Sequence, residues 1–409
     1  MKKLYYTLVL ALVLISSTLQ AQTWSKLTVD FDSNFYDVSF VNTNVGYVSG
    51  DNGQVFKTTN GGFSWTRQNT GVSEGLASIQ FLNENVGYAA SGFFQDYATI
   101  VKTVNGGFSW SKANLPSNKT GGGMWFINQN VGLYAYADSL YGTSTIVRTT
   151  NGGDTWTQVY LGEGWISYFS FPTETVGYAT VNNGTILKTT DGGASWNVLN
   201  LGSILWGSGI SFYSENVGLV GGQPKSGSKT TIYTTTNGGS SWNPIETNGM
   251  IFKIAHANVN NIYALSVDNL GKGFMIKSED GGVTWDMDDV EETQLRGIQF
   301  VSSTIGYAVG AEGVIIKYAK NAAISKVDNV LNTTIFPNPA SDFIYIRVNE
   351  YVGSNNQMNI YNCNGELVCT KNLLFALQDV DVSDLNQGVY FVQIVNEKSS
   401  EWHKIWVVR

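Results

Sequence analysis

A nine-residue phrase that recurs six times constrains this chain more than any other feature of its 409 residues. Its copies are KTTNGGFSW, KTVNGGFSW, RTTNGGDTW, KTTDGGASW, TTTNGGSSW and KSEDGGVTW, ending at Trp65, Trp110, Trp156, Trp196, Trp242 and Trp285. The tryptophans are spaced 45, 46, 40, 46 and 43 residues apart. A period of this length, with recurring glycine and aromatic positions, is typical of one four-stranded β-propeller blade. The repeat therefore predicts an all-β propeller.

A second phrase precedes each of these six tryptophans and occurs once more after the last of them, which allows the blades to be counted. It begins at Phe40, Phe81, Phe126, Phe171, Phe212, His256 and Phe300, and it ends seven residues later at Tyr47, Tyr88, Leu133, Tyr178, Leu219, Tyr263 and Tyr307. Each unit consists of four short alternating runs separated by turn residues such as Asn105-Gly106-Gly107. Six of the phrases carry a glycine before their last residue, for example Gly46, where we expect close backbone approach. Seven copies predict seven blades.

The seventh unit lacks its own tryptophan strand, and the start of the chain offers a replacement. Thr23-Trp24-Ser25-Lys26-Leu27 is similar to the fourth-strand sequence Trp110-Ser111-Lys112. We predict that this N-terminal strand completes the last blade, because closing the ring removes exposed sheet edges. The propeller is expected to span residues 22–320.

The first 21 residues have the pattern of an export signal. Lys2 and Lys3 precede an apolar run, Leu4–Ile15, and small residues lead to a cleavage point after Ala21. A membrane anchor is the alternative, but an apolar run of about 12 residues is shorter than the ~20 that span a bilayer. We therefore expect residues 1–21 to be a cleaved signal peptide, with no transmembrane segment in the mature chain.

Composition excludes several classes of function. The chain has 24 Lys and Arg against 32 Asp and Glu, a net charge of −8, which disfavours nucleic-acid binding. Two cysteines, Cys363 and Cys369, cannot supply a disulfide framework, so a packed core must stabilise the fold. If the hairpin turns at Asn364-Gly365, Cys369 faces Ile360 and not Cys363, so no disulfide is expected. We expect a monomer without cofactor or metal.

The repeated phrase resembles the Asp-box, or BNR repeat, with the pattern Ser/Thr-x-Asp/Asn-x-Gly-x-Ser/Thr-Trp. In the first copy this is Thr58-x-Asn60-x-Gly62-x-Ser64-Trp65. The units are most similar to the seven-bladed propellers related to the photosystem II stability and assembly factor. Sialidases, sortilin-type receptors and xyloglucan-degrading enzymes also carry the motif. This resemblance implies that the Asp-box is a structural turn distant from the ligand, and one propeller scaffold serves many functions.

A different kind of sequence occupies the C-terminal part. Residues 321–332 read as a polar linker, and residues 333–409 read as a small antiparallel β-sandwich. This segment resembles the type A sorting domain of the type IX secretion system, on Pro337, Asn338, Pro339, Gly365, Gly388, Tyr390 and Lys404. The resemblance implies a sorting signal, the secretion machinery as a partner, and a secreted or outer-membrane surface-attached protein. An accessory binding module is the alternative.

Ligand binding is expected on the face opposite the Asp-boxes, where the loops vary. The aromatic candidates there are Phe93, Phe94, Tyr97, Tyr136, Tyr141, Trp165 and Trp206. Exposed rings of this kind stack on sugars or anchor proteins, so we expect a glycan or an extracellular protein as ligand. The alternative for Trp165 and Trp206 is that they fill the central channel.

Catalysis has weaker support. The propeller contains three arginines, Arg67, Arg148 and Arg296, of which Arg148 is a repeat residue, so a sialidase is disfavoured. A glycoside hydrolase needs two facing carboxylates. Asp96, Asp138, Glu163, Asp268 and Glu292 are the candidates, and no phrase distinguishes a pair among them. His256 takes the place of a blade phenylalanine and is expected in the core, which leaves no base for a serine nucleophile. No catalytic residue is therefore assigned, and a hydrolase or an assembly scaffold remains the alternative to a binding protein.

Overall fold

The structure is a computed structural model in which the described residues form strands, turns and loops without any helix. It describes residues 23–27, 29, 33–92, 97–113, 115, 119–138, 142–201, 204–224, 230–247, 249–268, 270–288, 290, 294–319, 333–348, 356–363, 365–373, 375, 377–395 and 400–409. Residues 21–320 make one compact unit, and the described residues from Thr333 onward belong to a second. The expected signal peptide, residues 1–21, and the expected linker, residues 321–332, lie outside the described residues.

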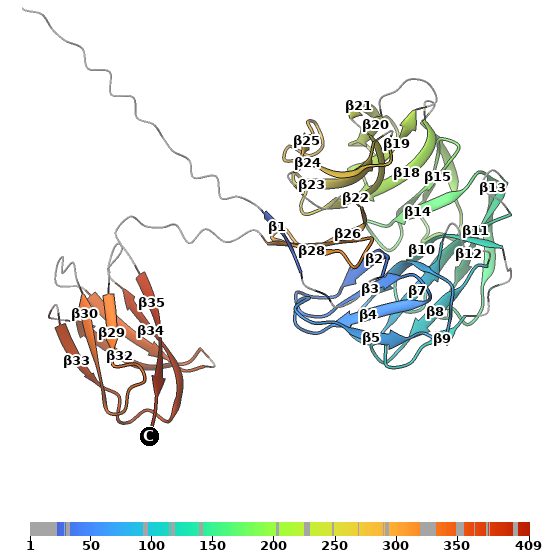
Figure 1. Cartoon of the computed structure of the whole chain (residues 1–409). Helices are drawn as coiled ribbons and strands as arrows, with labels where there is room; N and C mark the ends of the chain where they lie inside the picture. Colours follow the sequence, from blue (N-terminus) through green and yellow to red (C-terminus); the bar gives the residue numbers. More distant parts are fainter. Residues whose placement is uncertain are drawn as a thin grey trace, which may run out of the picture. The chain divides into compact units, whose positions relative to one another are not determined.

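The first unit contains seven four-stranded antiparallel sheets arranged as blades around a central axis (Figure 1). Blades 1 and 2 consist of β2 (Phe35–Phe40), β3 (Gly46–Gly50), β4 (Gln54–Thr58), β5 (Thr66–Asn69), β6 (Leu76–Phe81), β7 (Gly87–Ser91), β8 (Ile100–Thr103) and β9 (Ser111–Lys112). Blades 3 and 4 consist of β10 (Thr120–Phe126), β11 (Gly132–Ala137), β12 (Thr143–Thr149), β13 (Thr157–Glu163), β14 (Ile166–Ser170), β15 (Gly177–Val181), β16 (Thr185–Thr189) and β17 (Asn197–Asn200).

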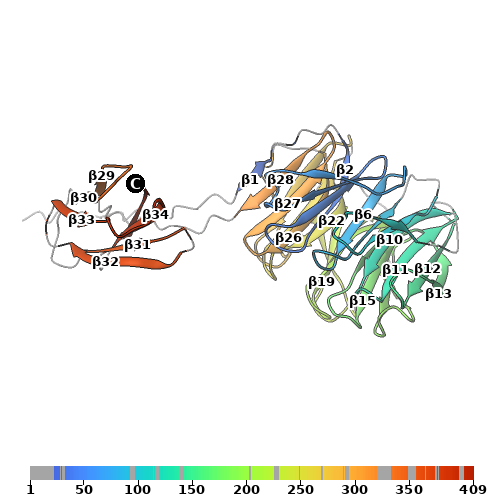
Figure 2. The same ribbon diagram turned by 90° about the horizontal axis from the view of Figure 1, so that it is seen from below.

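The remaining three blades follow the same strand order. Blades 5 and 6 consist of β18 (Ile204–Phe212), β19 (Gly218–Pro224), β20 (Thr230–Thr235), β21 (Asn243–Thr247), β22 (Met250–His256), β23 (Ile262–Val267), β24 (Gly273–Ser278) and β25 (Asp286–Met287). Blade 7 consists of β26 (Leu295–Ser302), β27 (Ile305–Gly310), β28 (Ile315–Ala319) and β1 (Thr23–Lys26). The first strands of neighbouring blades pack together around the axis, which Figure 2 shows from a second direction.

The N-terminal strand closes the ring. β1 pairs antiparallel with β28, so that Thr23 lies opposite Ala319 and Trp24 opposite Tyr318. The Trp24 ring packs against Tyr263 and Phe300, at 5.9 Å between centroids in both cases, and against Tyr318 at 5.4 Å. The seven-bladed propeller and its closure by the strand Thr23–Lys26 are confirmed.

Each Asp-box is a turn held by its own side chains. In blade 1 the Thr58 hydroxyl accepts the Gly62 N–H at 2.9 Å, and the Asn60 Oδ1 accepts the Ser64 N–H at 2.9 Å. Gly61 and Gly62 have φ angles of 69° and 90°, a region that residues with a Cβ rarely adopt. The Trp65 indole donates to the Gly62 carbonyl at 3.1 Å. The motif therefore fixes the turn between the third strand, β4, and the fourth strand, β5, and it is the structural turn that its resemblance implies.

The repeated basic residue connects one blade to the Asp-box of the next. Lys57 donates to the Gly106 carbonyl at 2.9 Å, and its ammonium lies 5.4 Å from the centre of the Tyr47 ring. The Tyr47 hydroxyl donates to the same carbonyl at 3.2 Å. Equivalent cation-to-carbonyl bonds are Arg148 to Gly192, Lys188 to Gly238 and Lys317 to Gly61. Because Lys317 belongs to blade 7 and Gly61 to blade 1, this series of contacts continues across the point where the ring closes.

The recurring glycines make room for a ring. A Cβ on Gly46 would overlap the Phe40 ring, and the equivalent clash recurs at Gly87, Gly132, Gly177, Gly218 and Gly306. The Phe ring then stacks on the tyrosine of the preceding blade, as Phe81 does on Tyr47 at 3.4 Å between centroids. The prediction of close backbone approach is therefore wrong at these glycines, because the space is taken by a side chain.

The second unit is an antiparallel sandwich of two sheets. Its strands are β29 (Thr333–Phe336), β30 (Phe343–Val348), β31 (Asn356–Tyr361), β32 (Leu367–Leu373), β33 (Leu377–Asp381), β34 (Gly388–Val395) and β35 (Ser400–Val407). The sheet orders are β29-β30-β33 and β32-β31-β34-β35. Ile360 pairs with Cys369, as predicted, and neither cysteine forms a disulfide.

Candidate functional site

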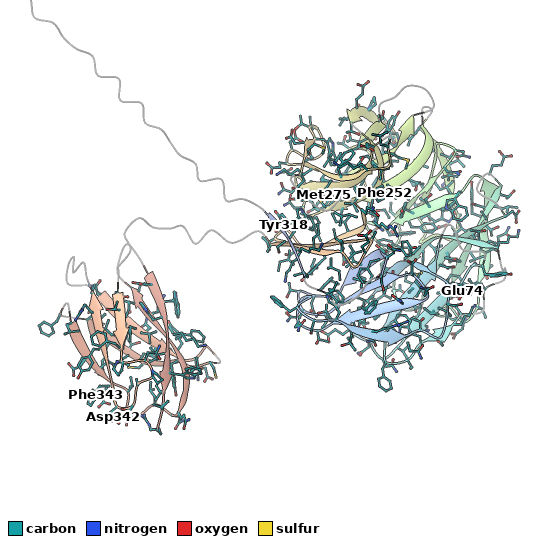
Figure 3. All side chains as sticks on the ribbon, in the orientation of Figure 1. Glu74, Phe252, Met275, Tyr318, Asp342 and Phe343 are labelled. Carbon is teal, nitrogen blue, oxygen red and sulfur yellow. The ribbon has the colours of Figure 1, made fainter. Side chains whose placement is uncertain are left out.

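A cavity of about 1100 Å³ occupies the centre of the propeller and is lined by the first strand of every blade. We call the end near the loops between second and third strands the upper mouth, and the end near the Asp-boxes the lower mouth. Phe252, labelled in Figure 3, is one of the apolar lining residues. The volume of the cavity and its mixture of polar and apolar lining residues suit a ligand pocket.

A partly buried cluster of three residues spans the middle of the cavity. The Lys253 ammonium of blade 6 lies 3.2 Å from Asp37 Oδ1 of blade 1 and 5.0 Å from the centre of the Tyr168 ring of blade 4. The other Asp37 oxygen accepts the Ile79 N–H at 3.2 Å. Burial by itself would lower the pKa of Lys253, but the neighbouring Asp37 carboxylate and Tyr168 raise it above the ordinary value. Lys253 is therefore charged and connects three blades across the axis.

The upper mouth carries a second cation, Arg296 of β26. Its guanidinium lies 4.9 Å from the centre of the Tyr36 ring. The Tyr36 hydroxyl bonds to Asp51, whose other oxygen accepts a hydrogen bond from Asn34 at 2.7 Å. Burial and this contact raise the pKa of Tyr36. Within the described part of the chain, no carboxylate forms an ion pair with Arg296.

Trp165 also lies at the upper mouth, just before β14. The backbone N–H of Trp165 donates to Asn182 Oδ1 at 2.6 Å, and the backbone carbonyl of Trp165 accepts the backbone N–H of Asn182 at 2.8 Å. The residue lines the cavity but is only 4% exposed. The prediction of an exposed ring is therefore wrong for Trp165, whereas its role in ligand binding and the channel-filling alternative both stay predictions. For Trp206, in β18, only the backbone is described, where it pairs with Gln223.

The predicted upper-face aromatics are not brought together. Tyr97 is 55% exposed, as expected for a ligand-facing ring. Tyr136 is 7% exposed and packs in the core between blades 2 and 3, so its expected exposure is wrong because β11 is a second strand covered on both faces. Phe93, Phe94 and Tyr141 lie outside the described residues. Their role in ligand binding stays a prediction.

His256 lies at the lower mouth, at the end of β22. Its Nδ1 is 2.8 Å from the Ser211 hydroxyl, and its ring lies 5.7 Å from that of Tyr213. Its Nε2 is buried and has no hydrogen-bond partner among the described residues. Burial lowers the pKa of His256 to about 4, so the ring is neutral at physiological pH. The predicted core position is met only in part, because His256 is half-buried and lines the cavity. Among the described residues, no third group bonds to its Nε2 to orient it as a base.

Of the candidate acids, Asp138 and Glu163 lie in blade 3, where both flank Thr143, and Asp268 lies in blade 6. Asp138 pairs with Lys119 at the surface, and Asp268 accepts the N–H groups of Leu270 and Lys272 within its own turn, at 2.8 Å each. Glu163 ends β13 and is exposed. Asp96 and Glu292 lie outside the described residues. Across the ranges that the structure describes, no group of three or more His, Cys, Asp or Glu is placed to hold a metal ion.

The residues of the predicted sorting signal have mostly structural contacts. Asn338 donates to the Lys404 carbonyl and accepts the Trp406 N–H, both at 2.9 Å, so the Pro337–Pro339 turn covers the outer edge of β35. Tyr390 is buried and donates to the Asn386 carbonyl at 2.9 Å, and Gly388 pairs with Val407. The Lys404 ammonium is directed outward, 5.6 Å from the centre of the Trp406 ring.

Sequence reasoning missed the cluster of Asp37, Tyr168 and Lys253 inside the cavity and the contact between Tyr36 and Arg296. In the aligned repeats, the position three before the blade phenylalanine is occupied by Asp37, Ser78, Gly123, Tyr168, Gly209, Lys253 and Gly297. The equivalent channel-facing position holds an acidic residue, Asp37, in blade 1 and a basic residue, Lys253, in blade 6, and this pattern could have indicated their contact. The position before that holds Tyr36 and Arg296, which meet at the mouth.

Family comparisons agree with this architecture. The family model described as photosynthesis system II assembly factor YCF48 matches residues 16–160, and the model described as secretion system C-terminal sorting domain matches residues 334–408. No curated protein matches the chain at a significant level. Within the described residues, no helix is long and apolar enough to cross a membrane.

Solved structures of the same fold include proteins of different functions. A YCF48 structure bound to D1 peptide has a TM-score of 0.59 at 18% identity, covering 74% of this chain and 97% of its own. A GH74 xyloglucanase from Xanthomonas campestris has a TM-score of 0.58 at 12% identity, covering 80% and 59%. PorZ, a bacterial surface component of the type IX secretion system of Porphyromonas gingivalis, has a TM-score of 0.50 at 12% identity, covering 94% and 61%. These likenesses show the fold alone.

The fold and the two family matches define an Asp-box β-propeller joined to a secretion sorting domain. The chain is a secreted or outer-membrane surface-attached protein that carries a type IX C-terminal sorting domain, and its propeller is similar to those of the YCF48 assembly factors.

Proposed function

We propose that this chain is a binding protein without catalytic activity, and that the upper mouth of its propeller binds an extended segment of an extracellular protein. Arg296 carries this proposal. It faces the cavity, is oriented by the Tyr36 ring, and has no carboxylate partner within the described part of the chain. An arginine in this state can donate paired hydrogen bonds to a carboxylate or to main-chain carbonyls of a ligand.

A binding role is also supported by the state of the nearby carboxylates. Asp37 is paired with Lys253 and bonded to the Ile79 N–H, and Asp51 bonds to Tyr36 and Asn34. A glycoside hydrolase needs one carboxyl group to donate a proton and another to attack or activate water. Both acids here are already engaged in contacts that fix their position. The YCF48 propeller with a bound D1 peptide supplies a precedent for peptide binding on this fold.

A glycan is the second candidate ligand. Tyr97 exposes 55% of its surface on the loop side of blade 2, where an accessible ring can stack on a sugar. The two ligand classes differ in their dependence on charge. A peptide held by Arg296 requires the guanidinium, whereas a sugar stacked on Tyr97 does not.

Selection of a displayed random-peptide library on the immobilised full chain tests the proposal. We expect enriched peptides to share an acidic residue, and Arg296→Glu to weaken their binding at least about tenfold, or about 1.4 kcal/mol. Arg67→Glu on the exposed strand β5 is the matched control and should bind normally. In parallel, affinity electrophoresis through polysaccharide gels tests the glycan alternative with a Tyr97→Ala variant. Unchanged peptide binding by Arg296→Glu, or retardation by one polysaccharide that depends on Tyr97, contradicts the peptide proposal.

A further inference from the structure

The sorting domain exposes an aromatic surface that none of its described residues covers. Side chains alternate along β35, so Ile405 and Val407 enter the core while Trp402, Lys404 and Trp406 are directed outward. Trp402 and Trp406 are 54% and 55% exposed. Phe391 of β34 lies opposite Lys404 and is also exposed on the same side. We call Phe391, Trp402, Lys404 and Trp406 the tryptophan face.

The rings of this face are braced by their neighbours. The Trp402 ring lies 5.4 Å from that of Tyr361, and the Lys404 ammonium lies 5.6 Å from the centre of the Trp406 ring. Large rings that are already oriented lose little conformational freedom when they bind. Tryptophan and tyrosine are also the residues that most often dominate the binding energy of protein interfaces. The face is therefore built as a binding surface and not as a loosely exposed core.

The charge of the face opposes the charge of its own domain. Segment 333–409 contains five Lys and Arg and eight Asp and Glu, a net charge of −3, in a chain of net charge −8. Among the described residues on the outer side of this sheet, Lys404 is the charged one, and no carboxylate accompanies it. An electropositive aromatic surface on an acidic domain complements a partner with exposed acids beside apolar groups.

The opposite sheet presents a different surface. Phe343, which is labelled in Figure 3, and Tyr345 are exposed on the outer side of β30. Asp379 and Asp381 pair with Tyr345 and Phe343 in the neighbouring strand β33, so carboxylates flank these rings. This second face supplies a control with the same sandwich and similar aromatic exposure but the opposite charge.

We propose that the tryptophan face is the surface by which a component of the type IX secretion machinery recognises this chain, through an acidic and apolar patch of that component. The face is continuous with the predicted sorting signal, since Asn338 bonds to the backbone of both Lys404 and Trp406. Tyr390 is buried and Asn338 is occupied within the domain, whereas the Lys404 ammonium is accessible. The inference rests on the sorting-domain match and is independent of the ligand proposed for the propeller.

Export of full-length variants from a type IX-secreting bacterium tests this surface. The fraction of the chain outside the cell is compared with the fraction retained in the periplasm. Lys404→Glu reverses the charge without removing core atoms, and Trp406→Ala removes one ring. We expect each to reduce export at least about fivefold, Lys404→Arg to export normally, and the control Tyr345→Ala to export normally. Thermal unfolding of each purified chain verifies that the sorting domain is folded.

The partner is identified with a photo-crosslinking residue at position 402, and the same residue at position 345 is the control. A crosslink from 402 to a secretion component, abolished by Lys404→Glu, supports the proposal. Normal export of a folded Lys404→Glu chain overturns it. So does a crosslink from 402 to the chain's own propeller or to a second copy. Retardation of the chain by a polysaccharide, lost on Trp402→Ala while export continues, would assign the face to a glycan instead. The Arg296→Glu variant, which tests the ligand of the propeller, should show normal export and normal crosslinking, so the two proposals can fail separately.

Discussion

Replacing Lys253 by methionine tests whether the cluster inside the cavity stabilises the closed ring. The substitution removes the ammonium that lies 3.2 Å from Asp37 Oδ1 and 5.0 Å from the Tyr168 ring centre, while keeping much of the side-chain volume. Asp37 then keeps only its bond from the Ile79 N–H and is left as an unpaired charge in a mostly buried position. Breaking a buried pair from one side costs about 3–5 kcal/mol.

The lower end of that range applies here, because the pair borders a cavity of about 1100 Å³ and not a tightly packed core. A loss of about 3 kcal/mol at about 2 °C per kcal/mol, the value for large domains, lowers the Tm by about 6 °C. Differential scanning calorimetry of the full chain measures this transition. Lys112→Met is the matched control, since its 3.5 Å pair with Glu74 lies at the surface, with the lysine exposed, and is worth less than about 1 kcal/mol.

A double variant separates the pair from the loss of lysine packing. Asp37→Asn removes the charge and keeps an oxygen for the Ile79 N–H, so Lys253→Met with Asp37→Asn should be more stable than Lys253→Met alone. If Lys253→Met melts within about 1 °C of the parent, or if the double variant is no more stable than the single one, the cluster does not support the ring and this reasoning fails.

Three further substitutions probe other contacts. Burial holds the pKa of His256 at about 4, against about 6.5 in the unfolded chain, so the stability that the neutral ring contributes is complete above pH 6.5 and is lost as the pH falls toward 4. Between pH 8 and pH 5, the free energy of unfolding of His256→Gln should therefore fall by about 2 kcal/mol less than that of the parent, as measured by urea unfolding. Equal losses in the two proteins would refute this. Trp24→Ala should destabilise the propeller by about 3–5 kcal/mol by calorimetry while Ser25→Ala changes little, and a normal melting curve for Trp24→Ala would show that the closing strand is dispensable. Asn338→Ala should accelerate hydrogen exchange at the Trp406 amide, whose bond it removes, and unchanged protection there would contradict the edge-covering role.

Much of the propeller could be predicted because each blade repeats the same local solution. The turn at Thr58–Trp65 depends on residues within seven positions of one another, so the phrase itself specifies the hydrogen bonds. The closing strand could be predicted because it contains a tryptophan, Trp24, as the fourth-strand sequences of the other six blades do. The pairing of Ile360 with Cys369 followed from the hairpin register.

Exposure was harder to predict than strand position. Tyr136 begins a long variable loop and Trp165 breaks the repeat pattern, and these two features suggested ligand contact, but both residues are buried. A loop-adjacent aromatic can turn inward to the core or outward to solvent, and the local sequence does not distinguish these two outcomes. The same limit applies to Gly46, where the reason for glycine is the Phe40 ring packed over it and not an approaching backbone.

The sequence by itself determined the blade period, the number of blades, the strand that closes the ring and the presence of a sorting domain, because these depend on local patterns repeated along the chain. Only the tertiary structure decided which residues meet at the axis. Asp37 and Lys253 are 216 residues apart and belong to different blades. Their contact arises because ring closure directs the first strand of every blade toward one shared cavity, where a charge from one repeat can be neutralised only by a residue of another.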